Sequence, residues 1–214
     1  MHWGDVVGVS IAVALVCSDG AAIGCDSTVV TSFGAVRQAQ PGEKCTKSED
    51  SRFVAAWTGG LSVSASVVAC VFKDETLSNA AAAANTLWSK LEEKLTDNDY
   101  ATFILLAGPG TQPQSVELWK ISAGKGAAVP QGAVRLYGTP THCRKHYIGD
   151  LTLTSSLVGL TEWQCCCPAP LSITDAEATC KDMIDQVIDA NGNKCLGPPV
   201  VMSISAGTSA GRSR

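Results

Sequence analysis

The chain has 214 residues, of which 45% are hydrophobic and 17% are charged, and its formal net charge is −4. An acidic chain with no basic cluster excludes a nucleic-acid surface and attachment to anionic membranes through positive charge. The length supports an ample core, and no Pro/Gly/Ser-rich linker divides it. We therefore expect one domain over residues 1–205 and a polar, disordered tail over residues 206–214.

The first apolar run and the cysteines bear on the cellular compartment. Residues 6–17 are too few to span a bilayer, and Asp5 precedes them instead of Lys or Arg, so a secretion signal is not expected. The cysteines are irregularly spaced and lie mostly within apolar runs, which predicts buried free thiols in a reducing, intracellular compartment, in the cytoplasm or in an organelle. They are Cys17, Cys25, Cys45, Cys70, Cys143, Cys165, Cys166, Cys167, Cys180 and Cys195.

Two clusters could in principle bind a metal. Neighbouring side chains in the triplet 165–167 cannot easily converge on one ion. His142 and His146 would share a face of a predicted helix, but no third ligand is placed nearby. We therefore expect no metal and no cofactor.

The first predicted element is a hairpin. Residues 6–16 form a β-branched apolar run, an Asp19-Gly20 break follows, and a second apolar run ends at Asp26. The hairpin places Ser10 on its first strand and Asp26 at the end of its second. A hydroxyl and a carboxylate on adjacent strands could form a nucleophile site or be the relic of one. The structural alternative is a small strand residue and a turn-forming carboxylate.

The next segments alternate between loop, strand and helix. Residues 28–48 are polar and broken by Pro41-Gly42, which predicts mostly loop, and residues 53–58 form a buried strand. Apolar residues from Leu61 to Phe72 recur at helical spacing. A second helix is indicated by a stronger stripe that consists of Ala84, Leu87, Trp88, Leu91 and Leu95.

The middle of the chain predicts further strands. Residues 102–107 form a continuous apolar strand, and residues 116–121 alternate as its partner. Residues 133–137 indicate another strand. We expect residues 141–160 to be helical in part.

The last elements are a helix and a strand. Thr174 and Glu177 have the spacing of a capping box, and Asn191-Gly192 ends the helix. Its apolar face consists of Ala176, Cys180, Met183, Ile184 and Val187. Residues 199–204 form the final strand. Strands alternating with helix pairs predict an α+β protein with helices outside stacked sheets, and hairpin-linked strands make parallel βαβ winding the weaker alternative.

Four segments together resemble the proteasome-type (threonine-type) subunits of the N-terminal-nucleophile hydrolase fold, and β-type subunits in particular. They are residues 10–20, residues 22–27, residues 53–60, and residues 174–204 with their Gly197-Pro198-Pro199 entry to the closing strand. The similarity spans roughly residues 8–205. It implies a four-layer αββα sandwich of two antiparallel sheets flanked by helix pairs, and assembly with other protein subunits, usually in stacked rings.

The resemblance also implies roles for individual residues. Ser10 matches the nucleophile, whose α-amine serves as base once self-cleavage frees it. Asp26 matches the strand-end carboxylate, and Lys44, with Lys47 as a substitute, matches its lysine partner. Two weaker matches are Thr139, at the oxyanion and proton-relay turn, and Asp189, at the late carboxylate.

Several departures from the family pattern bear on activity. Serine replaces threonine at residue 10, Val9 stands where glycine is usual, and Pro140 removes a backbone N–H that could donate. The serine that should follow Asp189 is absent. Because residues 1–9 precede Ser10, it has no free α-amine in this chain.

We therefore expect a catalytically silent subunit with a structural or assembly role in a larger complex. One alternative is an active peptidase that cleaves itself before Ser10, with Asp26 and Lys44 assisting. The other is an accessory subunit of an unrelated large complex. The sequence leaves partners, stoichiometry and substrate preference open.

Overall fold

The predicted N-terminal hairpin is present in the structure, a computed structural model. It describes residues 10–17, 19–30, 35–59, 61–73, 103–110, 115–122, 132–137, 144–149, 171–191 and 197–207. Strand β1 (Ile11–Val16) pairs antiparallel with β2 (Gly20–Asp26), and the N–H of Cys17 donates to the carbonyl of Gly20 at 2.8 Å. Every residue of both strands is buried. A strand apolar on both faces needs cover on both faces, and the rest of the fold supplies it.

The first sheet has the strand order β10-β1-β2-β11, with all neighbours antiparallel. Strand β11 (Pro199–Ser205) confirms the predicted final strand. Strand β10 (Arg144–Gly149) lies within residues 141–160, which were expected to be helical in part. That expectation is wrong for residues 144–149, and residues 141–143 and 150–160 lie outside the described residues. The apolar strand β1 needs a hydrogen-bonded partner on its second edge, and this distant pairing overrides local preference.

His146 therefore lies on a strand, opposite Ala14 of β1, and not on a helix face. His142 lies outside the described residues. The helical spacing on which the metal hypothesis for these two histidines depended is wrong.

The second sheet has the order β5-β6-β7-β8-β9, again antiparallel. It confirms the strands predicted at residues 53–58, 102–107, 116–121 and 133–137. Its members are β5 (Cys45–Lys47), β6 (Val54–Thr58), β7 (Phe103–Pro109), β8 (Val116–Ser122) and β9 (Gly132–Tyr137).

Residues 28–48, expected to be mostly loop, contain three short strands. Besides β5, strands β3 (Thr28–Val30) and β4 (Val36–Gln38) form a separate two-stranded sheet. Each is three residues long, which is too short for hydrophobic alternation to reveal.

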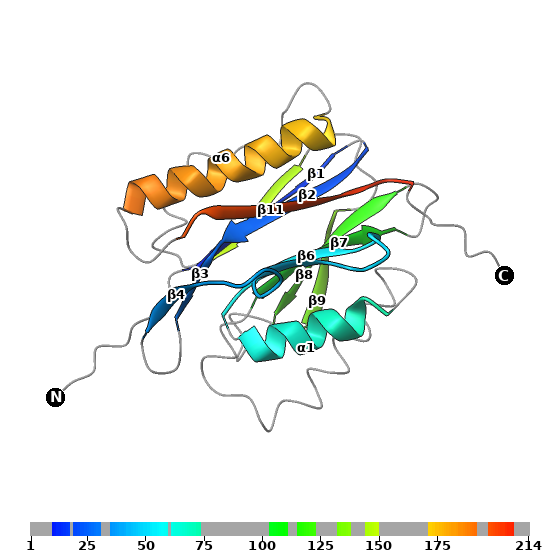
Figure 1. Ribbon diagram of the computed structural model, residues 1–214. Coiled ribbons are helices and arrows are strands. Elements are labelled where there is room, and N and C mark those ends of the chain that lie inside the picture. Colours follow the sequence, from blue (N-terminus) through cyan, green and yellow to red (C-terminus); the bar gives the residue numbers. More distant parts are fainter. Residues whose placement is uncertain are drawn as a thin grey trace.

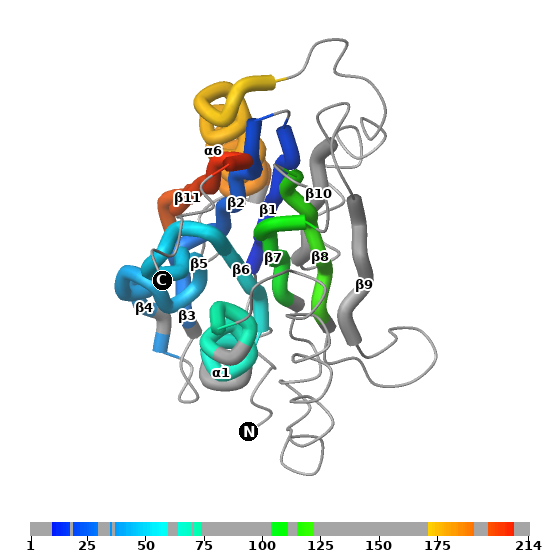
Figure 2. The backbone as a smooth tube through the Cα atoms, turned by 90° about the vertical axis from the view of Figure 1, so that its right-hand side faces the viewer, coloured from blue at the N-terminus to red at the C-terminus, as the bar shows by residue number. Residues whose placement is uncertain are grey.

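The two large sheets face each other, and among the described residues one helix covers each outer face (Figure 1). Helix α6 (Ile173–Asn191) packs its predicted apolar stripe on β1 and β2, and α1 (Leu61–Val71) packs on β6, seen end-on in Figure 2. Small side chains fill much of the space between the sheets, among them Ala12, Ala14, Cys25, Cys45, Ala56 and Ala107. The antiparallel sheets confirm an α+β fold. The second helix predicted within residues 84–95 lies outside the described residues.

The cap of α6 differs from the predicted one. The N–H of Asp175 donates to the hydroxyl of Ser172 at 3.2 Å, and that hydroxyl donates to the Asp175 carboxylate at 2.7 Å. Ser172 is therefore the N-cap, and Thr174 is not. The Glu177 carboxylate accepts a hydrogen bond from Ser203 on β11 at 2.5 Å instead of closing a capping box. Ser172 and Asp175 have the same spacing as Thr174 and Glu177, so spacing alone cannot choose between them.

Three further observations concern the described residues. No helix among the described residues is long and apolar enough to cross a membrane. Cys17, Cys25, Cys45 and Cys180 are buried thiols that form no disulfide. At the C-terminal end, the N–H of Ala206 donates to the carbonyl of Asp19 at 2.7 Å, so Ala206 is bonded to the domain, whereas residues 208–214 lie outside the described part.

Candidate functional site

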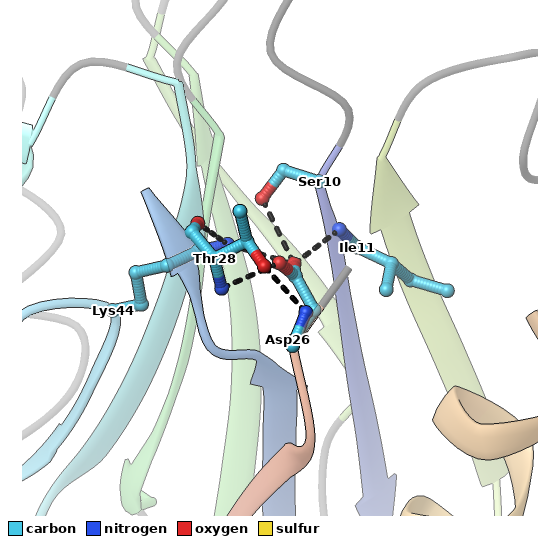
Figure 3. Close-up of polar contacts among 6 residues, drawn as sticks. Ser10, Ile11, Asp26, Thr28 and Lys44 are labelled. Atoms are coloured by element: carbon cyan, nitrogen blue, oxygen red, sulfur yellow. Dashed lines mark hydrogen bonds and ion pairs between the residues drawn. The ribbon is translucent and has the colours of Figure 1, made fainter. Parts of the chain in front are cut away.

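The site is organised around the carboxylate of Asp26, the last residue of β2, which is fully buried. Its Oδ1 accepts hydrogen bonds from the Ser10 hydroxyl at 3.2 Å, the N–H of Ile11 at 2.9 Å and the Lys44 ammonium at 2.7 Å (Figure 3). Its Oδ2 accepts from the N–H of Thr28 at 3.0 Å. Four donors on one carboxylate compensate for its removal from water.

Lys44 supplies the positive charge, and only 5% of its side chain is exposed. It directly precedes β5, and besides Asp26 its ammonium donates to the carbonyl of Thr28 at 2.9 Å. Thr28 thus binds both members of the ion pair through its backbone. A buried ion pair is tolerated only when further hydrogen bonds satisfy its atoms, and Thr28 provides one on each side.

Ser10 lies directly before β1 and is 8% exposed. Its hydroxyl shares Oδ1 of Asp26 with the Lys44 ammonium, so the hydroxyl lies beside both a carboxylate and a cation. A cation beside a hydroxyl stabilises the negative charge that the oxygen develops when it attacks a carbonyl. The arrangement suits a nucleophile.

A charged clamp holds the loop before Lys44. The Arg37 guanidinium donates to both carboxylate oxygens of Glu43, at 2.6 and 2.7 Å, and the N–H of Gln40 donates to the same carboxylate at 2.5 Å. These hydrogen bonds lower the pKa of Glu43 to about 2, and those from Arg37 have the larger effect.

The backbone on either side of Lys44 is also held. Gly42, in the turn before it, has a φ of 85°, a left-handed conformation that glycine adopts without strain. The carbonyl of Lys44 accepts the N–H of Trp57 at 3.0 Å. The turn and this bond hold the start of β5 against β6, and that position directs the lysine side chain to Asp26.

Two thiols lie beside the ion pair in sequence, Cys25 next to Asp26 and Cys45 next to Lys44, and both belong to the core between the sheets. A hydrogen bond with Cys45, then burial, raises the pKa of the Cys25 thiol well above its usual value, and the opposing effect of Lys44 is smaller. The Cys25 thiol therefore stays protonated at neutral pH and is a packing group, not a nucleophile.

The structure brings three of the five expected site residues together: Ser10, Asp26 and Lys44. Lys47, the proposed substitute for Lys44, lies exposed at the far end of β5. Asp189 is exposed in the last turns of α6, and within the described residues no hydrogen bond or ion pair joins it to this cluster. Thr139 lies outside the described residues.

Sequence reasoning missed Thr28 and the clamp between Arg37 and Glu43. Thr28 acts through its backbone N–H and carbonyl, which no residue type reveals. Opposite charges six residues apart, on either side of Pro41-Gly42, were the available signal for the clamp.

No protein-family model and no curated protein matches the sequence. Solved structures do match the fold. Anbu (ancestral beta-subunit) from Yersinia bercovieri has a TM-score of 0.61 at 15% identity over 91% of this chain and 81% of that chain. Anbu from Hyphomicrobium sp. strain MC1 has a TM-score of 0.64 at 14% identity over 92% and 83%.

The helical assembly of the Anbu complex from Pseudomonas aeruginosa gives a TM-score of 0.64 at 14% identity over 92% and 82%. At such identities the likeness concerns the fold alone. The chain has a proteasome-like fold.

Proposed function

We propose that this chain is a β-type-like subunit of a proteasome-like protein assembly, with a latent N-terminal-serine hydrolase site. The site is silent while residues 1–9 remain attached and becomes active when the Val9–Ser10 bond is cut. The observation that carries the proposal is the sharing of Asp26 Oδ1 by the Ser10 hydroxyl and the Lys44 ammonium. A buried ion pair is seldom a net gain in stability, so its position beside a hydroxyl favours a chemical role.

The uncleaved chain lacks a base. The nitrogen of Ser10 is part of a peptide bond, so its lone pair is delocalised and cannot take the hydroxyl proton. In this state the subunit contributes structure alone, the role favoured by the sequence.

Cleavage follows from the chemistry of the same hydroxyl. The Ser10 Oγ attacks the carbonyl carbon of Val9, its proton passes to the departing nitrogen, and the C–N bond breaks to leave an ester. Water then hydrolyses the ester, which releases residues 1–9 with a new carboxylate and leaves Ser10 with a free α-amine.

The freed amine completes the site. It accepts the proton of the Ser10 hydroxyl as the oxygen attacks a substrate amide, and it returns that proton to the leaving nitrogen. Lys44 stabilises the developing charge, and Asp26 holds both Lys44 and the N–H of Ile11. Water releases the acyl group and regenerates the serine.

The proposal also covers the oligomeric state of the chain and the number of layers in its fold. The Pseudomonas aeruginosa relative of this fold forms a helical assembly. We infer that this chain also works as an oligomer, with itself or with other subunits, and that a second helix beside α1 and beside α6 completes a four-layer αββα sandwich.

A permanently silent subunit is the second candidate. It is favoured by Val9 in place of the usual glycine and by Pro140, which cannot donate a backbone hydrogen bond. An accessory subunit of an unrelated complex would be silent in the same way.

The test is the intact mass of natively purified protein, with Ser10→Ala as the matched control. We expect the wild-type mass to be lower by residues 1–9 and the Ser10→Ala variant to keep them. A full-length wild type would establish the silent subunit, and truncation of both proteins would assign the cut to another protease. Proteins that co-elute in size-exclusion chromatography then distinguish a proteasome-like assembly from an unrelated complex.

A further inference from the structure

Thr28 binds both members of the ion pair, so its own position bears directly on the geometry of the site. Its N–H donates to Oδ2 of Asp26 at 3.0 Å, and its carbonyl accepts a hydrogen bond from the Lys44 ammonium at 2.9 Å (Figure 3). A rotation of the Thr28 backbone would weaken both bonds at once. Whatever fixes the backbone of Thr28 therefore also fixes Lys44 relative to Ser10.

The strand that begins at Thr28 is a weak support by itself. Strand β3 has three residues and pairs with β4 in a two-stranded sheet that is separate from the two large sheets. A two-stranded ribbon is only marginally stable in water. The place of Thr28 beside the large sheets therefore depends on contacts other than its pairing with β4.

The hydroxyl of Thr28 makes such a contact with the entry to β11. The N–H of Gly197 donates a hydrogen bond to Thr28 Oγ1. Pro199 lies opposite Asp26 in the register of β11 and β2, so Gly197 and Thr28 each lie two residues beyond the last pair of this ladder. Thr28 is 8% exposed, so little water competes for the bond.

The sequence of this entry leaves no substitute for the bond. Residues 198 and 199 are prolines, which have no backbone N–H, so Gly197 carries the only backbone donor of residues 197–199. A Cβ on Gly197 would lie 2.6 Å from Ser27 Oγ and 3.1 Å from Thr28 Oγ1. The absence of a side chain at residue 197 therefore permits the close approach to Thr28.

We infer that Thr28 is a positioning residue for Lys44, and that its hydroxyl acts by binding the entry of β11 through Gly197. Strand β11 thereby helps to place the cation that lies beside the Ser10 hydroxyl. The inference rests on the proposed function, in which Lys44 assists the attack by Ser10. A small displacement of a positioned group lowers a reaction rate strongly, so the loss of this one contact is measurable.

The rate at which the Val9–Ser10 bond is cleaved tests the inference. The full chain is synthesised in a cell-free system, and its intact mass is followed over time. Thr28→Val, which keeps the shape of the side chain without the hydroxyl, should slow cleavage about fivefold to tenfold. Thr28→Ser, which keeps the hydroxyl, should be cleaved at a rate within about twofold of the wild type.

A variant on the other side of the contact should have the same effect. Gly197→Ala should slow cleavage to a similar extent, because its Cβ moves the N–H of residue 197 away from Thr28. The double variant Thr28→Val/Gly197→Ala should be no slower than the slower single variant, since both changes remove one contact. If the two effects multiply in the double variant, the residues act separately and the inference is wrong.

Two matched controls separate positioning from stability. The hydroxyl of Ser27, next to Thr28, is buried without a hydrogen-bond partner in the part of the chain that the structure describes, so Ser27→Ala should be cleaved at the wild-type rate. Ser172→Ala removes the cap of α6 near Asp19, at the opposite end of β2 from Asp26, and should also keep that rate. The inference is wrong if Thr28→Val is cleaved like the wild type, if Thr28→Ser is as slow as Thr28→Val, or if Ser172→Ala is slowed as much.

A second measurement does not require cleavage. In the Ser10→Ala chain, which cannot cleave itself, NMR records how fast the ammonium hydrogens of Lys44 exchange with water, and the signal is assigned by its absence from a Lys44→Arg variant. Buried, hydrogen-bonded hydrogens exchange slowly. Adding Thr28→Val should speed this exchange about fivefold, whereas adding Ser27→Ala should leave it unchanged. An uncleaved wild type together with this difference would contradict the hydrolase and support the positioning role, and equal exchange in all three chains would overturn that role.

Discussion

At the scale of single residues, Asp26 is the group on which the site depends, because its two oxygens accept four hydrogen bonds. Lys44 is the only cation among these donors. Breaking a buried pair by removing one partner costs far more than the pair contributes, because the other charge is left without a counterion.

Lys44→Met should therefore destabilise the protein by about 3–5 kcal/mol, since it leaves the buried Asp26 carboxylate without its cation. Urea denaturation measures the change. Lys47→Met, two strand residues after Cys45 and exposed, should change stability by less than about 0.5 kcal/mol.

The double variant Asp26→Asn/Lys44→Met completes the test. It should recover part of the loss, because neither buried charge remains. If the double variant loses as much stability as Asp26→Asn and Lys44→Met lose together when each is made alone, the two side chains do not interact.

At the scale of elements, α6 covers the outer face of the sheet that contains β1 and β2, and Ser172 caps its N-terminal end. The hydroxyl of Ser172 satisfies the N–H of Asp175, one of the donors that the first turn of a helix leaves free. Thr174 belongs to the first turn of the helix, and its side chain is exposed to solvent.

Ser172→Ala should cost about 1 kcal/mol of folding stability. Thr174→Ala, the matched substitution at the position that the sequence favoured, should change it by less than about 0.5 kcal/mol. Thermal or urea denaturation of both variants decides the matter, and the opposite order would make Thr174 the cap.

How far the sequence predicts these elements depends on how local their causes are. The apolar stripe of α6, the alternation of β8 and the continuous apolar runs of β6 and β7 are local patterns, so these elements could be recognised. Strand β10 could not, because it exists through its pairing with β1, more than a hundred residues away. For the site, the resemblance to a known family pointed to Ser10, Asp26 and Lys44, whereas the backbone role of Thr28 arises only when separate elements meet.

At the scale of the whole molecule, the two sheets approach each other over small side chains. Helix α6 also packs closely on the outer face of the sheet. A Cβ on Gly24 would lie 2.9 Å from side-chain atoms of Ile184 on α6 and of Val201. The packing of the layers therefore depends on residues that are small as much as on residues that are apolar.

Ala14→Leu should destabilise the protein by about 1–3 kcal/mol or more, because Ala14 is fully buried between the sheets and three extra carbon atoms have no room. Ala178→Leu, on the exposed side of α6, is the control and should be nearly neutral. Denaturation curves for the two variants measure the difference. Equal stability of both would mean that the space between the sheets can adapt.

The bond between the N–H of Ile11 and Asp26 has a consequence for the conformational freedom of a cleaved chain. New chain ends usually fray, and a reacting group on a frayed end loses entropy each time it is positioned. Here the residue after Ser10 is already bonded to Asp26, and the next, Ala12, pairs with Cys25 on one side and Ile148 on the other. An amino terminus created at Ser10 would have the torsions of one residue to restrict, so most of the entropic cost of positioning it is met when the sheet folds.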